Sequence, residues 1–253
     1  SVSRVDQGVA KLVAILKEAG QYDNTLIVFT SDHGIAMPGS KTTVYEPGLT
    51  VPMIYKLPGK PTPETAGRVC EAMVSHVDLT PTLLDAAGAL PQPVANAPQR
   101  PRAAATLANL QGRSYWNVLK EQKPTGWDEI NASHTFHEIT MYYPMRVVRD
   151  RKYKLIWNLA APLPFPFASD LWEAPTWQAV YEKGPDALYG KRTVKNYIQR
   201  PTFELYDLTA DPHEIHNLAT DSAHAKLLEE MKGKVKAFQK KTNDPWIMKW
   251  DYE

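Results

Sequence analysis

The first ninety residues alternate between a helix-like and a strand-like pattern of apolar side chains. Residues 2–19 place apolar side chains at spacings of three and four, and Gly20 follows as a natural helix end. Residues 25–30 then form an unbroken apolar and β-branched run, which is typical of a strand buried on both faces in a parallel sheet. Residues 51–55 predict a further short strand. Helix, short turn and buried strand make one unit of a doubly wound α/β fold.

A change in composition divides the chain after this pattern. Thr80, as the N-cap, and Gly88 bracket a short helix. Residues 89–106 contain several prolines among alanines and polar residues, which is typical of a linker or loop. We therefore expect one domain over residues 1–106 and a second over residues 107–253.

The second part has the pattern of a small α+β lobe. Residues 145–148 and 153–157 flank a charged turn and predict a β-hairpin, and residues 203–208 predict another strand. Residues 222–241 carry the apolar stripe of a long amphipathic helix. Residues 160–200 are rich in Pro, Trp and Tyr without clear periodicity, and we predict no regular structure there.

Composition narrows the classes of function. The 253 residues carry a formal net charge of +1, which gives no reason to expect a nucleic acid or an anionic membrane as partner. No apolar run approaches the length of a transmembrane helix. Cys70 is the single cysteine, so no intrachain disulfide can form. The chain begins at Ser1, without Met and within a helical pattern, and we expect a piece of a longer protein.

The first candidate site follows the apolar run of residues 25–30. Ligands of open α/β sheets bind outside the carboxyl ends of the strands, where Asp32 and His33 are expected. Asp32 offers a hard oxygen ligand for Ca²⁺ or Mg²⁺, although an aspartate that caps a turn is the alternative. His33 fits a ligand or a hydrogen-bonded histidine. Lys41, in a loop rich in turn residues, fits an anion contact or a solvated lysine.

A second polar cluster lies in the second part of the chain. His134, His137 and Glu138 could supply metal ligands, but their spacing matches no closed zinc motif, and a loop that contacts substrate is an equal alternative. Arg146 fits an anion contact or a simple ion pair with Glu138.

Several long motifs resemble the sulfatase family, and they occur in the family's order. These motifs are Val5-Asp6-x-Gly8-Val9, Asn24-Thr25-Leu26-Ile27-Val28-Phe29-Thr30-Ser31-Asp32-His33-Gly34, Lys41-x-x-x-Tyr45-Glu46-Pro47-Gly48-x-x-Val51-Pro52, Ser75-x-x-Asp78-Leu79-x-Pro81-Thr82 and Glu204-Leu205-Tyr206-Asp207-Leu208-x-x-Asp211-Pro212-x-Glu214-x-x-Asn217-Leu218. Other segments resemble the sulfamidase subgroup, the heparan N-sulfatases. They are His137-Glu138-x-Thr140-Met141-x-Tyr143-Pro144-Met145-Arg146, Pro164-Phe165-Pro166, Pro175-Thr176-Trp177-Gln178 and Asn243-Asp244-Pro245-Trp246.

The resemblance implies a fold and a chemistry. The fold would be the C-terminal part of an alkaline-phosphatase-like doubly wound α/β sheet, followed by a small α+β lobe with antiparallel strands and a long C-terminal helix. In such enzymes a cysteine of a Cys-x-Pro-Ser-Arg motif becomes formylglycine, whose hydrate attacks the sulfate sulfur. A divalent cation, usually Ca²⁺, holds the sulfate oxygens. The substrate would be a sulfated sugar, with N-sulfoglucosamine of the heparan type as one candidate.

The resemblance also implies roles for individual residues. Asp32 matches a metal-binding aspartate, and His33 matches a position that is His in some sulfatases and would act on the metal or in catalysis. Lys41 matches a basic sulfate contact. The substrate-binding residues would be His137, Glu138, Arg146 and Asp244.

One family feature is absent from the sequence. No Cys-x-Pro-Ser-Arg or Ser-x-Pro-Ser-Arg motif occurs, and Cys70 lies in another context. We therefore expect the nucleophile in an N-terminal half of the same enzyme, which would be the partner of this chain. The alternatives are another hydrolase of the superfamily, such as a phosphodiesterase or phosphonate hydrolase, and a non-catalytic interaction module.

Overall fold

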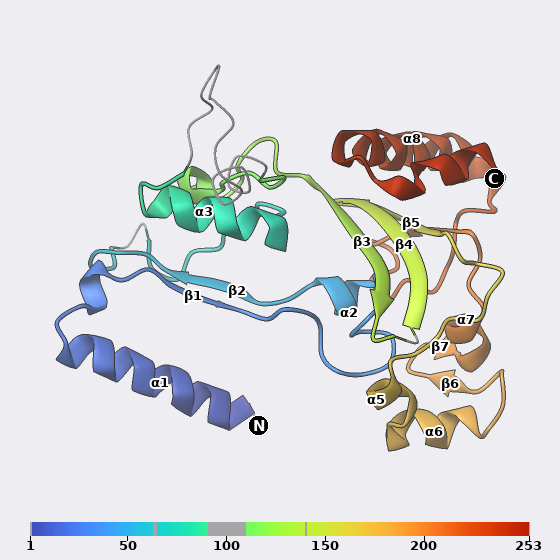
Figure 1. The fold of residues 1–253 in the computed structure, drawn as a ribbon, viewed down its shortest axis with the longest axis horizontal. Coiled ribbons are helices and arrows are strands. Elements are labelled where there is room, and N and C mark those ends of the chain that lie inside the picture. Colours follow the sequence, from blue (N-terminus) through green and yellow to red (C-terminus); the bar gives the residue numbers. More distant parts are fainter. Residues whose placement is uncertain (1, 63–64, 91–109, 140, 253) are drawn as a thin grey trace.

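The computed structural model describes residues 2–62, 65–90, 110–139 and 141–252 (Figure 1). Its helices of the α type are α1 (Val2–Glu18), α2 (Glu46–Leu49), α3 (Leu79–Ala86), α5 (Ser169–Trp172), α6 (Pro175–Tyr181), α7 (Val194–Ile198) and α8 (Ala225–Thr242). Its strands are β1 (Ile27–Thr30), β2 (Met53–Lys56), β3 (Glu129–His137), β4 (Met141–Asp150), β5 (Tyr153–Asn158), β6 (Leu188–Tyr189), β7 (Arg192–Thr193) and β8 (Phe203–Asp207). Short 3₁₀ helices cover Tyr22–Asn24, His76–Asp78, Trp116–Val118, Ser222–His224 and Pro245–Asp251. Across these described ranges, no helix combines the length and the apolar character needed to cross a membrane.

The N-terminal part contains the predicted helix and strands in a different arrangement. Strand β1 pairs with β2 in antiparallel register, from Ile27 opposite Lys56 to Thr30 opposite Met53. All four residues of β1 are half-buried, and α1 has no buried residue. Within the described residues, the expectation of a parallel strand buried on both faces is therefore wrong for β1, because its described partner is antiparallel and its residues are only half-buried. The apolar run predicted a strand correctly, but not its partner.

The structure places the N-cap of α3 at Asp78, two residues before the predicted N-cap Thr80. Ser75 and Asp78 form a capping box, in which Asp78 Oδ2 accepts a hydrogen bond from the Ser75 N–H at 3.0 Å. Asp78 Oδ1 also accepts from the Arg113 N–H at 2.9 Å. Thr80 is thus the second residue of α3 and not its N-cap, because the 3₁₀ helix that Ser75 and Asp78 cap runs directly into α3.

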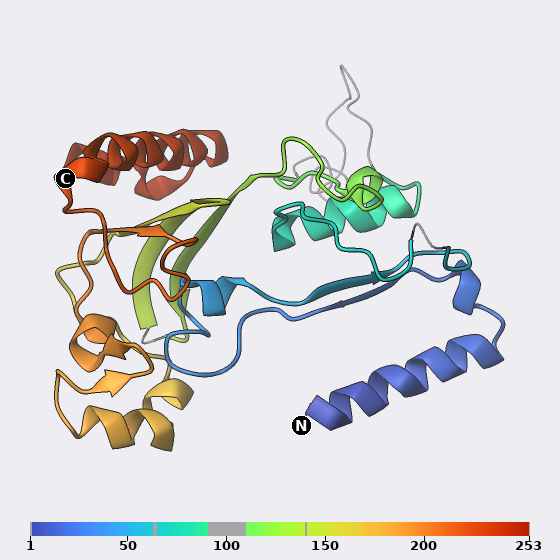
Figure 2. The ribbon, with the colours of Figure 1, turned by 180° about the vertical axis from the view of Figure 1, so that it is seen from behind.

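The centre of the C-terminal part is an antiparallel sheet with the strand order β3-β4-β5-β8 (Figures 1 and 2). Helix α8 lies over one face, where Met231 and Val235 pack against Leu155 and Trp157 of β5. Ile156 points to the other face, because successive side chains of a strand alternate. The hairpin, the strand after residue 203 and the long helix confirm the predicted α+β lobe. Strand β3 was missed, because its polar residues interrupt the apolar alternation.

Residues 160–200 fold into short elements, contrary to the prediction of no regular structure. Helices α5, α6 and α7 and the ribbon β6-β7 enclose a small core around Trp177, Val194 and Tyr197. Each element has two to seven residues, which is too short for periodicity to appear in the sequence. The predicted domain boundary after residue 106 lies outside the described residues.

Candidate functional site

The loop after β1 folds back on itself and fixes the backbone near Asp32 and Lys41. The Gly34 N–H donates to the carbonyl of Gly48 at 3.2 Å, and the Lys41 N–H donates to the carbonyl of Ile35 at 3.2 Å. A Cβ atom on Gly34 would lie 1.8 Å from the Pro47 carbonyl oxygen, so only glycine fits this approach. Asp32 and Lys41 therefore lie at the two ends of a closed loop.

Asp32 and His33 lie at the exposed beginning of this loop. The Asp32 side chain is 85% exposed, and its Oδ2 lies 3.6 Å from His33 Nε2. His33 Nδ1 lies 2.6 Å from the carbonyl oxygen of Gly34. A carbonyl can only accept, so Nδ1 carries the hydrogen and Nε2 is left facing Asp32.

The predicted metal ligands do not form a metal site by themselves. Within the ranges that the structure describes, no three His, Cys, Asp or Glu side chains come close enough to hold a metal ion. Asp32 offers one carboxylate beside the His33 imidazole, whereas Ca²⁺ takes six to eight oxygen ligands. His134, the alternative ligand on β3, lies 3.3 Å from the carbonyl of Tyr143 through Nδ1, and burial lowers its pKa. The described residues alone therefore do not fit a Ca²⁺ ion.

Lys41 has a partner that sequence reasoning missed. Its Nζ lies 2.8 Å from Oδ2 of Asp170, the second residue of α5. The Lys41 side chain is 15% exposed and that of Asp170 is 50% exposed. The hydrogen bond from Lys41 holds the pKa of the Asp170 carboxyl below its usual range, so this residue is ionised at neutral pH. Asp170 lies between two segments that resemble the sulfamidase subgroup, which was the available signal.

The turn between β3 and β4 brings Glu138 to the same place. Glu138 has a φ of 57°, and its carboxylate accepts from the Ser169 hydroxyl at 3.2 Å and the Ser169 N–H at 3.3 Å. His137 Nε2 lies 3.7 Å from Glu138 Oε1, and His137 also contributes to the low pKa of Asp170. The structure therefore joins three of the predicted site residues, Lys41, His137 and Glu138, through Ser169 and Asp170.

Arg146 and Asp244 are engaged with each other. The guanidinium makes a two-point contact with the carboxylate, through Nε to Oδ2 and through Nη2 to Oδ1 at 3.0 Å. The two side chains are 7% and 9% exposed. Arg146 Nη1 also donates to the carbonyls of Met145 and His134 at 2.8 and 3.2 Å. The alternative pair of Arg146 with Glu138 is therefore wrong, and Asp244 takes the place of Glu138.

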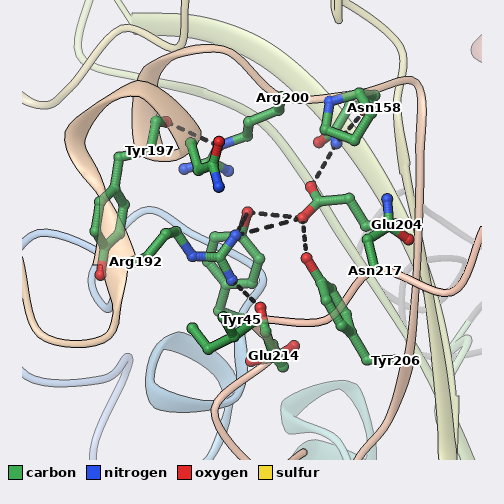
Figure 3. Close-up of polar contacts among 12 residues, drawn as sticks. Tyr45, Asn158, Arg192, Tyr197, Arg200, Glu204, Tyr206, Glu214 and Asn217 are labelled. Atoms are coloured by element: carbon green, nitrogen blue, oxygen red, sulfur yellow. Dashed lines mark hydrogen bonds and ion pairs between the residues drawn. The ribbon is translucent and has the colours of Figure 1, made fainter. Parts of the chain in front are cut away.

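A buried polar cluster joins the motif around Tyr45 to the motif around Glu204 (Figure 3). Glu204 accepts hydrogen bonds from Tyr45 at 2.9 Å, Tyr206 at 2.5 Å and Asn158 at 2.7 Å. Arg192 lies 3.6 Å from Glu204 and donates to the Tyr45 hydroxyl at 2.9 Å. Burial raises the pKa of Tyr45 and of Tyr206, so both hydroxyls keep their protons and donate.

A second buried group extends this cluster. Lys154 is fully buried, and its Nζ lies 2.8 Å from Glu214 and 3.1 Å from Glu46. Glu214 also accepts from the Glu46 N–H at 2.6 Å, and Arg149 lies 3.2 Å from the Glu46 carboxylate. These contacts hold α2 against the sheet, next to the loop that carries Lys41.

Comparisons with known proteins agree with the motifs. Residues 1–89 match the family model described as Sulfatase. N-sulphoglucosamine sulphohydrolase of Homo sapiens is 38% identical over 251 residues, which cover 98% of this chain and 48% of the human protein. An ulvan-active sulfatase of Formosa agariphila is 26% identical, with 92% of this chain and 36% of that protein covered. The chain thus spans about half the length, or less, of these curated relatives.

Solved structures show the same fold. A structure described as a complex with its substrate, D-glucosamine-2-N,6-O-disulfate, matches with a TM-score of 0.64 and 24% identity, over 97% of this chain and 40% of that one. The phosphonate monoester hydrolase of Agrobacterium radiobacter matches with a TM-score of 0.60 and 21% identity, over 95% and 40%. The alkaline-phosphatase-like fold predicted from the sequence is confirmed by these matches, and the resemblance to sulfatases extends over nearly the whole chain.

Proposed function

We propose that this chain is part of a sulfatase that hydrolyses sulfate groups of sugars, with N-sulfoglucosamine as the substrate. The observation that carries the proposal is the 38% identity to an N-sulphoglucosamine sulphohydrolase over 98% of this chain. Since the chain spans 48% of that relative, we place the formylglycine nucleophile in a further segment of the same enzyme.

Lys41 would bind the sulfate in this reaction. A transferring anionic group needs fixed positive charge where negative charge develops. The Lys41 ammonium has a nearly buried stem and is held in one direction by Asp170, so it is oriented before substrate arrives.

His33 would hold or accept a proton at Nε2. Its Nδ1 hydrogen is committed to the Gly34 carbonyl, so Nε2 of the neutral ring has a free lone pair. Asp32 lies beside Nε2 and would stabilise the protonated ring.

The set of metal ligands is incomplete among the described residues. The family resemblance implies a catalytic metal, and we propose that it is Ca²⁺, with Asp32 as one ligand and His33 beside it. The described residues lack the other oxygen ligands, so we attribute them to the further segment and derive no step through the ion.

His137 and Glu138 would contact the sugar. They lie at the turn next to Lys41 and Asp170, where the ring of a substrate whose sulfate is bound by Lys41 would pass. Arg146 and Asp244, which contact each other, would support this loop through the hydrogen bond from Arg146 to the His134 carbonyl and affect sugar binding only through it.

The test is hydrolysis of glucosamine N-sulfate and of an aryl sulfate by two proteins, the full gene product and residues 1–253 alone. We expect the full product to release sulfate and residues 1–253 to release none. Turnover by residues 1–253 would disprove the proposal that the nucleophile lies elsewhere. Failure of the full product on both substrates would disprove the sulfatase proposal.

A second candidate is a phosphoryl- or phosphonyl-transfer enzyme. It is favoured by the match to the phosphonate monoester hydrolase and by 26% identity to a multifunctional alkaline phosphatase superfamily protein of Trinickia caryophylli. A phenylphosphonate monoester, assayed beside the sulfates, separates the two. A protein that binds these ligands but hydrolyses none would be the non-catalytic module.

A further inference from the structure

Asp170 contacts Lys41, the residue that would bind the sulfate in the proposed sulfatase. The residue that pairs with Lys41 comes from a part of the chain 129 positions away. Lys41 is nearly buried, whereas half of the Asp170 side chain is exposed, so Asp170 is the member of the pair that a ligand meets first.

The structure holds Asp170 from both sides. Leu171, its neighbour in α5, is 2% exposed and packs in the core of the sheet. Trp172 packs against Phe167, with ring centroids 5.8 Å apart. Glu138 fixes the preceding Ser169 through its N–H and its hydroxyl. Asp170 is therefore presented on a short helix that is anchored before and after it.

The charge of Asp170 opposes the binding of sulfate alone. Its carboxylate is ionised, because Lys41 lowers its pKa, and it lies 2.8 Å from the ammonium that would bind the sulfate. A like charge near a bound anion costs affinity unless the ligand brings a donor that the carboxylate can accept. A carboxylate has about four lone-pair positions, so it can accept from a ligand while it keeps Lys41.

We propose that Asp170 determines specificity by accepting a hydrogen bond from a donor next to the sulfate, such as a sugar hydroxyl or the N–H of a sulfamate. This inference rests on the proposed function, with Lys41 as the sulfate contact. A substrate with such a donor keeps the carboxylate satisfied, and a simple aryl sulfate leaves it facing the sulfate. A site built to bond an OH or NH rejects analogues that lack it.

The experiment compares Asp170→Ala with wild type in the full gene product, on glucosamine N-sulfate and on an aryl sulfate. We expect kcat/KM for the sugar sulfate to fall about 100-fold, while the value for the aryl sulfate changes by less than about threefold. Asp170→Asn, which keeps the shape and one accepting oxygen, should fall in between on the sugar sulfate. Asp128→Ala is the matched control, because Asp128 is 58% exposed and also pairs with a basic residue, Arg151. Thermal melts check that every variant folds.

Two results would overturn the inference, and a third would overturn the proposed function on which it rests. Equal losses on both substrates would make Asp170 a positioning residue for Lys41, and unchanged selectivity would remove it from recognition. If the wild type turns over neither substrate, the proposed function fails, and calorimetry then compares glucosamine N-sulfate with inorganic sulfate as ligands. Asp170 determines specificity only if wild type prefers the sugar sulfate and Asp170→Ala loses at least about tenfold of that preference.

Discussion

At the scale of single residues, two lysines show how burial decides a role. Lys154 is fully buried, and its ammonium forms ion pairs with two glutamates, Glu46 and Glu214, that stabilise the fold. Lys41 has one carboxylate partner, Asp170, which is itself half exposed, so the ion pair as a whole lies at the protein surface. The sequence alone left Lys41 as either a solvated lysine or a sulfate contact. The structure excludes a freely solvated side chain, because only 15% of it is exposed.

Replacing Lys41 separates catalysis from folding. We expect Lys41→Ala in the full gene product to lower turnover about 100-fold, because it removes fixed positive charge at the sulfate. Lys41→Arg should retain part of the activity, since the charge stays and the geometry changes. Steady-state kinetics and a thermal melt are measured for each variant. Near wild-type kinetics for Lys41→Ala would contradict a sulfate contact, and a collapsed melting temperature would make Lys41 structural.

The residues of the site differ in how far the sequence could reveal them. Asp32, His33 and Lys41 follow a strongly apolar strand and lie in a long motif, so pattern and resemblance both pointed to them. Asp170 lies in a four-residue helix, which is too short to show periodicity. Its partner Lys41 is 129 positions away in the sequence. Contacts between distant segments depend on tertiary packing, which no local pattern records.

At the scale of elements, the buried pair of Arg146 and Asp244 attaches the C-terminal 3₁₀ helix to β4. Asp244 also accepts from the Trp246 N–H at 3.0 Å, so one carboxylate caps this helix and neutralises Arg146. Burial raises the pKa of Asp244, but the hydrogen bonds from Arg146 and Trp246 outweigh it and leave the pKa below its usual range. Long elements such as α8 were predictable from their period, whereas this attachment was not.

The pH dependence of stability tests that pair. A carboxyl whose pKa is lower in the folded state stabilises above its unfolded pKa, about 4, and loses this contribution as pH falls through the folded pKa. We expect Asp244→Asn in the full gene product to lower the free energy of unfolding at pH 7 by about 3 kcal/mol. The difference from wild type should shrink below about pH 4. Denaturant unfolding at several pH values measures this.

The control for Asp244 is an exposed ion pair. Asp128 and Arg151 have side chains 58% and 43% exposed, so Asp128→Asn should change the free energy of unfolding by less than about 1 kcal/mol. A difference for Asp244→Asn that stays constant down to pH 2 would show that the charge of Asp244 is not what stabilises the fold.

The buried cluster around Glu204 forms a second contact between elements, joining the start of α2 to the sheet through Tyr45. Glu204→Gln keeps the shape but leaves Arg192 without its buried carboxylate, so we expect a loss of about 3 kcal/mol of unfolding free energy. Glu229→Gln on the exposed face of α8, where the side chain is 71% exposed, is the matched control and should change stability by less than about 1 kcal/mol. Similar small effects for both variants in denaturant unfolding would contradict a stabilising role for Glu204.

At the scale of the whole molecule, the two predicted parts of the chain are joined by charge as well as by apolar packing. Tyr45 and Glu46 of the sulfatase-matched segment contact Glu204, Lys154 and Glu214 of the C-terminal part. The loop that carries Asp32 and Lys41 is thereby fixed to the sheet. This attachment explains how Lys41 reaches α5, and it places Asp32 at an exposed edge with one carboxylate.

Calcium binding tests whether Asp32 is one ligand of a metal site that residues 1–253 do not complete. Affinity for Ca²⁺ follows the number of charged ligands and the rigidity of the site, and a single exposed carboxylate beside an imidazole supplies little of either. We expect residues 1–253 to bind Ca²⁺ no more tightly than about 1 mM by calorimetry, and the full gene product to bind at least about a hundred times more tightly. Asp32→Ala should abolish the tight binding, and Asp23→Ala, at an exposed position before β1, should leave it unchanged. Tight binding by residues 1–253 would show that the chain holds a complete metal site, and tight binding that survives Asp32→Ala would exclude Asp32 as a ligand.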